Sequence, residues 1–250
     1  MSCLRTPVVL QTPADPFPSW DALLADSLPH VPGDAEAAGE AAQTVGWHGL
    51  VAVGGELSPE RLLAAYALGL FPWFGERDPV LWWSPDPRCV LPLDGLHLSR
   101  RFRRVLRHKR WHVTHDTAFA AVVAACARVP RPGQPGTWIV PAMRRAYARL
   151  HSLGYAHSVE VREGDRLVGG LYGVALGRAF FGESMFHLVP DASKVALAHL
   201  VGHLRERGFT LLDCQQANGH NLRMGGVVIT RREFMGRLAA ATQGVEPQLF

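Results

Sequence analysis

The alternation of apolar and polar residues is most regular in the second half of the chain. It predicts strands over 158–162, 166–176 and 178–186. Apolar residues at helical spacing from Leu197 to Leu204 then predict a helix that begins at Asp191 or Ser193 and ends at Gly208, and an apolar run over 209–214 predicts a buried strand. A meander, a helix and a further strand together predict a layered α/β fold.

The first half of the chain predicts mainly helices. They are expected over 20–28, 58–68, 100–110, 117–128 and 141–153, with one strand over 47–53. The helix after Ser58 has the strongest start signal, because Ser58 is a favoured N-cap and Pro59 takes the first helical position. Two aromatic, proline-rich stretches, 70–74 and 81–87, lack a helical period and predict either an aromatic core or a stacking platform.

Length and composition leave the domain count open. The chain has 250 residues, 48% apolar and 19% charged, as is typical of a globular protein of one large or two small domains. The four scattered cysteines predict free thiols and no zinc site, and no segment is long and apolar enough for a signal peptide or a membrane helix. We therefore expect a cytoplasmic protein.

Charge is unevenly distributed along the chain. Residues 1–50 carry a net charge of −5 and the remaining residues +9. Seven basic residues of the helix predicted over 100–110 form one face of it: Arg100, Arg101, Arg103, Arg104, Arg107, Lys109 and Arg110. This face favours contact with phosphates of a polyanion, although a simple solvated face is the alternative.

Two short clusters are candidates for chemistry. Glu183 is an acid within an apolar, aromatic strand, and either binds a cation or hydrogen-bond donors or points outward to solvent. Asp213 and Gln215 follow a buried strand at its C-terminal end, where α/β folds place sites, although a capping aspartate is the alternative. His199 and His203 have the spacing of a zinc-binding helix, but neither the usual glutamate nor a third ligand accompanies them, so no metal is expected.

Several long motifs resemble those of one bacterial family. They include Gly54-Gly55-Glu56-Leu57-Ser58-Pro59, Leu70-Phe71-Pro72-Trp73-Phe74, Leu81-Trp82-Trp83-Ser84-Pro85-Asp86-Pro87-Arg88, Gly136-Thr137-Trp138-Ile139, His157-Ser158-Val159-Glu160-Val161, Phe181-Gly182-Glu183-Ser184-Met185-Phe186, Asp191-Ala192-Ser193-Lys194 and Asp213-Cys214-Gln215. In order and spacing, over about residues 46–238, they resemble the leucyl/phenylalanyl-tRNA–protein transferases of the N-degron pathway.

The resemblance implies a fold and an activity. We expect a small N-terminal domain over 1–88, with 1–45 as a poorly ordered acidic lead-in, and a GNAT-like domain with a mixed, mostly antiparallel sheet over 89–250. The enzyme would transfer Leu or Phe, with Met as a further candidate, from aminoacyl-tRNA to proteins that begin with Arg or Lys and so mark them for degradation. It would need no ATP, cofactor or membrane and would act as a monomer.

The resemblance also implies roles for individual residues. Asp213 and Gln215 would be the catalytic pair, with Gln215 polarised by Asp213, and Glu183 would hold an α-amine. An apolar pocket for the aminoacyl side chain would consist of Met185, Leu197, Leu200, Leu204 and Leu212. Trp73 and Trp138 would stack on the terminal adenosine, and the basic helix would contact tRNA phosphates.

Other interpretations and some departures remain. A non-catalytic RNA-binding module would explain the basic helix but not the acids, and an acetyl-CoA-dependent N-acetyltransferase would need a glycine-rich turn that 187–191 lacks. His187 replaces a serine that is usual in the family. Arg223, Met224 and Thr230 also depart from the family pattern, so substrate preference or rate could differ.

Overall fold

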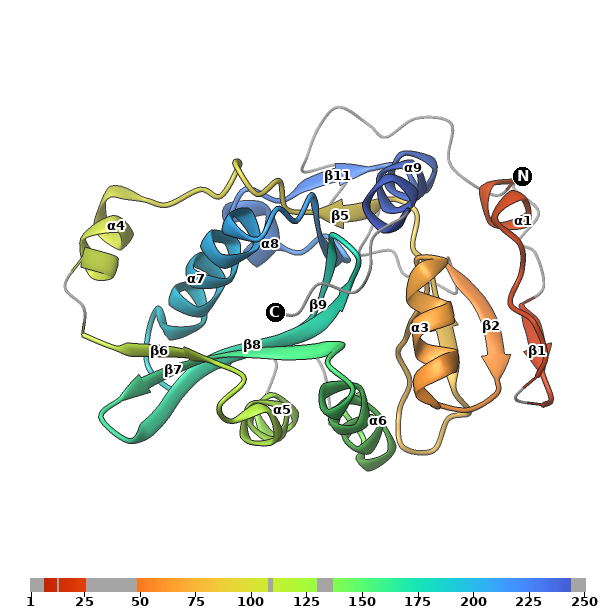
Figure 1. The fold of residues 1–250 in the computed structure, drawn as a ribbon, viewed down its shortest axis with the longest axis horizontal. Coiled ribbons are helices and arrows are strands. Elements are labelled where there is room, and N and C mark those ends of the chain that lie inside the picture. Colours follow the sequence, from red (N-terminus) through yellow and green to blue (C-terminus); the bar gives the residue numbers. More distant parts are fainter. Residues whose placement is uncertain (1–6, 13, 26–48, 108–109, 130–136, 244–250) are drawn as a thin grey trace.

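A computed structural model describes residues 7–12, 14–25, 49–107, 110–129 and 137–243. Two sheets organise these residues (Figure 1). The larger sheet has seven strands in the order β11-β5-β10-β9-β8-β7-β6. Its strands are β5 (Arg88–Val90), β6 (His112–His115), β7 (Ala156–Glu163), β8 (Arg166–Leu176), β9 (Ala179–His187), β10 (Leu211–Gln215) and β11 (Val227–Ile229).

Neighbouring strands of this sheet are antiparallel except at one step. β9 and β10 run parallel, and α7 (Ala192–Glu206) connects them. The expected α/β class with a mixed, mostly antiparallel sheet is therefore confirmed. The predicted strands and the helix after them match β7, β8, β9, α7 and β10 closely, although Asp191 is not the expected side-chain cap: its carboxylate accepts a hydrogen bond from Lys194 Nζ at 2.9 Å.

Helices cover both faces of the seven-stranded sheet. α5 (Phe119–Arg128) and α6 (Pro141–Ser152) pack on one face and α7 on the other (Figure 1). Gly169 of β8 permits the close approach of α7, because a Cβ atom there would lie 2.6 Å from the Cβ of Ala192. A separate helix, α4 (Arg100–Arg107), has its buried residue Phe102 in the hydrophobic cluster on the α7 side.

The N-terminal part of the chain forms the smaller sheet. Its four strands, in the order β1-β2-β4-β3, are β1 (Val8–Leu10), β2 (Leu50–Gly54), β3 (Phe71–Pro72) and β4 (Leu81–Trp83). α3 (Pro59–Ala67) follows β2 and begins as predicted, with the Ser58 hydroxyl accepting a hydrogen bond from Arg61 N. Trp82 and Trp83 are buried, so the second aromatic stretch contributes to a core.

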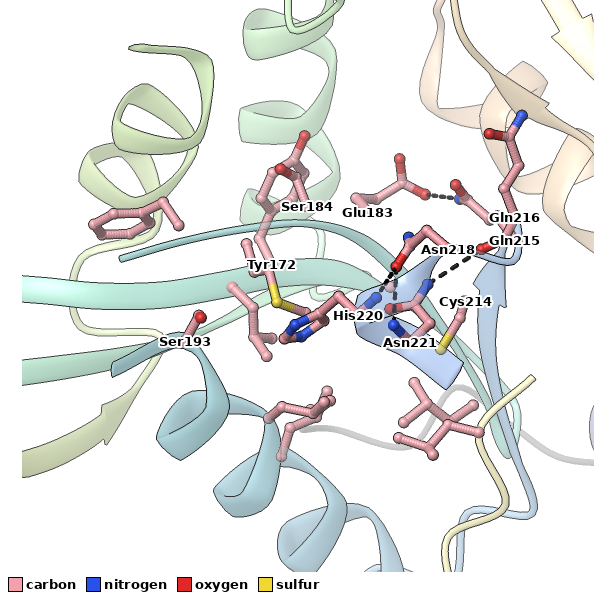
Figure 2. A pocket seen from close by; sticks show the side chains of 18 of the residues that line it. Tyr172, Glu183, Ser184, Ser193, Cys214, Gln215, Gln216, Asn218, His220 and Asn221 are labelled. Atoms are coloured by element: carbon pink, nitrogen blue, oxygen red, sulfur yellow. Dashed lines mark hydrogen bonds between the residues drawn. The ribbon is translucent and has the colours of Figure 1, made fainter. Parts of the chain in front are cut away.

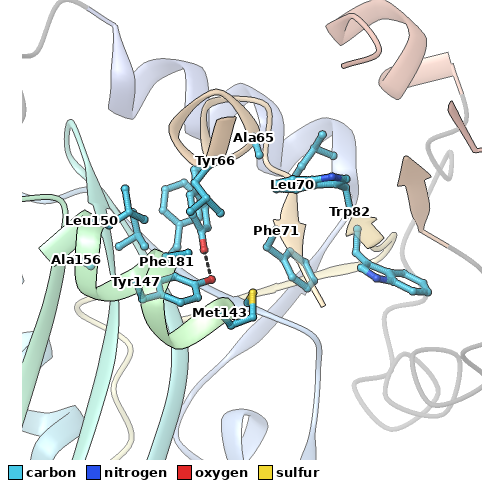
Figure 3. Close-up of a cluster of buried hydrophobic side chains, with 14 of the residues drawn as sticks. Ala65, Tyr66, Leu70, Phe71, Trp82, Met143, Tyr147, Leu150, Ala156 and Phe181 are labelled. Carbon is cyan, nitrogen blue, oxygen red and sulfur yellow. Dashed lines mark hydrogen bonds between the residues drawn. The ribbon is translucent and has the colours of Figure 1, made fainter. Parts of the chain in front are cut away.

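Buried contacts of one hydrophobic cluster join the two sheets. One hydrophobic cluster holds Tyr66 and Trp82 from the N-terminal part together with Tyr147 and Phe181 from the larger part (Figure 3). The expected domain boundary after residue 88 falls inside β5. The chain closes with α8 (Gly219–Arg223) and α9 (Arg231–Thr242), and α9 packs against α3; α1 (Trp20–Ala25) belongs to the N-terminal segment.

Candidate active site

A pocket of about 500 Å³ opens where β9 and β10 separate. The two strands pair in parallel only as far as Phe181 and Asp213. Beyond that point β9 continues to His187 paired with β8, and β10 ends at Gln215 paired with β5, so the two strands no longer pair with each other. Glu183 and Gln215 therefore face a shared opening, and both line the pocket (Figure 2).

Glu183 is the most constrained side chain of this pocket. The residue is buried, with 8% of its surface exposed. Tyr66 Oη donates to Oε1 at 2.8 Å, Tyr147 Oη to Oε2 at 2.7 Å, and Gln215 Nε2 to Oε1 at 2.9 Å. The two tyrosines come from α3 and α6, so elements far apart in the sequence meet at this one carboxyl.

The surroundings of the Glu183 carboxyl favour its protonated form. Tyr66 Oη and Tyr147 Oη also lie 2.7 Å apart (Figure 3). Three oxygen–oxygen contacts therefore share the protons of two hydroxyls. A proton on Glu183 would supply the third. Burial raises the pKa of Glu183 to about 7, with a smaller contribution from the nearby Asp213, although the hydrogen bonds from Tyr147, Tyr66 and Gln215 oppose the rise. Glu183 can therefore hold or release a proton near neutral pH.

Asp213 is fully buried and does not reach the Gln215 side chain. Arg88 Nε donates to its Oδ1 at 2.9 Å and Arg88 Nη2 to its Oδ2 at 2.6 Å. Oδ1 also accepts a hydrogen bond from the backbone N of Gln215 at 2.8 Å. The contact thus differs from the expected polarisation of the Gln215 amide, which instead donates to Glu183.

Four of the five residues predicted to form the aminoacyl pocket lie around the cavity. Met185, Leu197, Leu200 and Leu212 all line the cavity. Leu204 is fully buried in the core and does not line it, because α7 carries this residue one turn beyond Leu200. His220 lines the same pocket, and burial lowers its pKa, which favours a neutral ring there (Figure 2).

Both tryptophans expected at the adenosine site also line the pocket. Trp73 packs edge-on against Trp83 at 5.6 Å between ring centroids, and Trp83 Nε1 donates to the Trp73 carbonyl. Trp138 lies in the short segment before α6. Both side chains remain partly exposed, as a stacking surface requires.

The basic helix is shorter than predicted. α4 ends at Arg107 and presents five exposed arginines: Arg100, Arg101, Arg103, Arg104 and Arg107. Lys109 lies outside the described residues. Arg110 follows the helix and pairs with Glu163, with Nη2 and Oε1 2.7 Å apart, so part of its charge is already engaged.

Other kinds of site find no support within the described part of the chain. No group of three or more His, Cys, Asp or Glu side chains there could hold a metal ion. Within the same residues, no helix has the length and apolar character needed to cross a bilayer. Cys89 and Cys214 are free thiols.

Three site residues carried no sequence prediction. Tyr66 and Tyr147 lie on buried helix faces and Arg88 at the end of an aromatic motif. A hydroxyl on an otherwise apolar helix face was the available signal for the tyrosines, since buried polar groups need partners. Nothing in the sequence indicates that both partners would be Glu183.

Comparison with known proteins connects this geometry to a family. The sequence model described as "Leucyl/phenylalanyl-tRNA protein transferase" matches residues 90–239, and the model of that family's N-terminal domain matches residues 55–86. The first match spans β5 to α9 and so includes Glu183, Asp213 and Gln215.

Curated relatives agree with these matches. The "Leucyl/phenylalanyl-tRNA--protein transferase" of Nitratidesulfovibrio vulgaris (strain DP4) is 62% identical over 195 residues, 78% of this chain and 83% of that protein. The protein of the same name from Xanthomonas euvesicatoria pv. vesicatoria (strain 85-10) is 50% identical over 99% of this chain and 91% of its own length. Among solved structures, a GCN5-related N-acetyltransferase from Kribbella flavida is 12% identical, with a TM-score of 0.36, over 69% of this chain and 63% of that chain.

Proposed function

The chain belongs to the leucyl/phenylalanyl-tRNA–protein transferase family and is an aminoacyltransferase that acts from tRNA onto proteins; from this premise we propose its substrates. The aminoacyl group is Leu or Phe, and Met is a further candidate. The acceptor is the α-amine of a protein that begins with Arg or Lys. The reaction takes place in the cytoplasm and marks the acceptor for degradation.

One observation carries the proposal: a single carboxyl, with a pKa of about 7, lies beside an apolar wall. Among the described residues that line the pocket, Glu183 is the sole acid, and no lysine or arginine lines it. A carboxylate offers about four acceptor positions, and three are taken. The remaining position suits an amine, while Met185, Leu200 and Leu212 suit an apolar side chain.

The chemistry requires no external energy. The neutral amine attacks the ester carbonyl, the new C–N bond forms, and the C–O bond to the tRNA ribose breaks. The proton lost by the amine ends on the ribose oxygen that leaves. An α-amine has an ordinary pKa of about 7.7–8.0, so a useful fraction is neutral and nucleophilic near pH 7.

The pocket residues would share this work. Glu183 holds the amine and passes its proton, and Gln215 orients Glu183 and the reacting groups. Trp73 and Trp138 stack on the terminal adenosine, and the arginines of α4 contact tRNA phosphates. An apolar pocket discriminates by only about 1–3 kcal/mol per methylene, so the shape of the wall must exclude β-branched side chains.

The direct test measures transfer of labelled Leu or Phe from charged tRNA to a peptide that begins with Arg. We expect transfer by the wild type, and loss of at least about 100-fold in Asp213→Ala, because the backbone of Gln215 loses its anchor.

A peptide of the same sequence that begins with Asp serves as the control acceptor and should receive nothing. Equal transfer to both peptides would contradict the proposed acceptor preference. Absence of transfer by the wild type, or full activity in Asp213→Ala, would contradict the proposed site.

A further inference from the structure

Arg88 occupies the junction between the N-terminal part of the chain and the catalytic strand β10. Its guanidinium is fully buried, and each of the three nitrogens donates a hydrogen bond. Two of these bind the carboxylate of Asp213, and Nη1 donates to the carbonyl of Gly69 at 3.0 Å. Phe71 and Phe234 flank the charge, with ring centroids at 5.0 and 4.3 Å.

One of these contacts fixes Gln215. Asp213 Oδ1, held by Arg88, also accepts from the backbone N of Gln215 at 2.8 Å. Gln215 has a φ of 62°, a left-handed conformation that costs a residue other than glycine about 1–2 kcal/mol. The bond to Asp213 offsets that cost and aims the Gln215 amide at Glu183.

The other contact fixes Tyr66. Gly69 ends the turn that follows α3, and its backbone N donates to the Tyr66 carbonyl at 2.9 Å. The Gly69 carbonyl, bound to Arg88, therefore ties the last turn of α3 to the same guanidinium. Tyr66 and Gln215 are the two donors that share Glu183 Oε1. Arg88 therefore holds both donors in place, one through Gly69 and the other through Asp213.

We propose that Arg88 is a positioning residue of the transfer reaction, which sets the places of Gln215 and Tyr66 at Glu183 without lining the pocket itself. The inference rests on the proposed function. It assigns Arg88 a part in turnover that a purely structural ion pair would not have. A bidentate guanidinium with a third donor cannot be replaced by an ammonium, which lacks the planar fork.

The test compares Arg88→Lys and Arg88→Met with the wild type in the transfer assay over a range of pH. We expect kcat to fall about 10- to 100-fold, because a displacement of about 1 Å has that effect on a reacting group. KM for aminoacyl-tRNA should stay within about threefold, because Trp73, Trp138 and α4 do not contact Arg88. Tyr66 and Gln215 lower the pKa of Glu183, so their displacement should also move the acidic limb of the kcat profile to higher pH.

Arg231→Lys is the matched control. Arg231 is also a buried arginine beside the N-terminal part, but it donates to the carbonyls of Leu23 and Ser84 and does not bind Asp213. The variant Arg231→Lys should lower Tm as Arg88→Lys does, while kcat and the acidic limb of the kcat–pH profile stay unchanged.

Each result has one meaning. The inference is supported if the Arg88 variants, but not Arg231→Lys, show a lower kcat and an acidic limb shifted to higher pH. If Arg88→Lys behaves as Arg231→Lys does, or if neither Arg88 variant folds, Arg88 is a core residue and the inference is overturned. If the wild type transfers nothing, the proposed function fails as well, and that outcome is visible before any variant is compared.

Discussion

At the scale of single residues, the Glu183 carboxyl should make the folded protein less stable as the pH rises. Its pKa is about 7 in the folded state against an ordinary value of 4.5. Between these values the folded state binds more protons than the unfolded state, so the free energy of unfolding falls as pH rises through this window. Glu183→Gln removes this dependence. In urea unfolding, the free energy of unfolding of the variant relative to that of the wild type should rise by about 2–3 kcal/mol between pH 5 and pH 8.

Glu163→Gln is the control for this prediction. Glu163 is a half-exposed carboxylate that pairs with Arg110 on the surface, where such pairs contribute about 0–1 kcal/mol. Its stability relative to wild type should be nearly the same at both pH values. An equal response of the two variants would contradict the prediction. Glu183→Gln should also lose transfer activity, as expected where a catalytic group is retained at a cost in stability.

At the scale of elements, the sequence pattern predicted the strands and helices whose structure depends on residues close together in the chain. The strands from 156 to 187 and the helix after them repeat at periods of 2 and 3.6 residues over long runs, and their sequence neighbours are also their neighbours in space. β5 and β11 have three residues each and pair with strands distant in the chain, so no periodicity identifies them. The partners of Glu183 escaped prediction for the same reason, since Tyr66 precedes it by 117 positions.

The helix α4 allows a prediction at this scale. Replacing Arg100, Arg103 and Arg107 with Ala removes three exposed charges but keeps a good helix former at each position. If these arginines contact tRNA phosphates, the slope of log affinity against log salt should become shallower by about 2–3, or 0.7–0.9 for each lost contact. Filter binding of aminoacyl-tRNA at several salt concentrations would measure the slope.

Arg110→Ala provides the comparison, because Arg110 already pairs with Glu163 beside the end of α4. It should change the slope by less than any one α4 arginine. A triple variant with the wild-type slope would instead show that α4 is a solvated face, and kcat for bound tRNA should be unaffected in either case.

At the scale of the whole molecule, buried contacts link the N-terminal part to the larger sheet. Tyr66 packs on Phe181 with ring centroids 4.9 Å apart, and α9 packs on α3. Arg61 and Arg231 extend this linkage to the first 25 residues through backbone carbonyls, those of Thr12 and Asp15 for Arg61 and that of Leu23 for Arg231. These contacts cross the expected division after residue 88, which stays a prediction.

This packing predicts that the described parts unfold together. An interface built from fully buried aromatic and apolar side chains couples two units more strongly than the polar interfaces that let domains move or unfold separately. In urea, native-state hydrogen exchange should show the amides of α3 and of β8 losing protection with the same midpoint, and fluorescence and far-UV circular dichroism should give coincident curves. A lower midpoint for α3 would show that the N-terminal part opens alone. Because Tyr66 of α3 supplies one donor to Glu183, such opening would also dismantle the active site before the larger sheet unfolds.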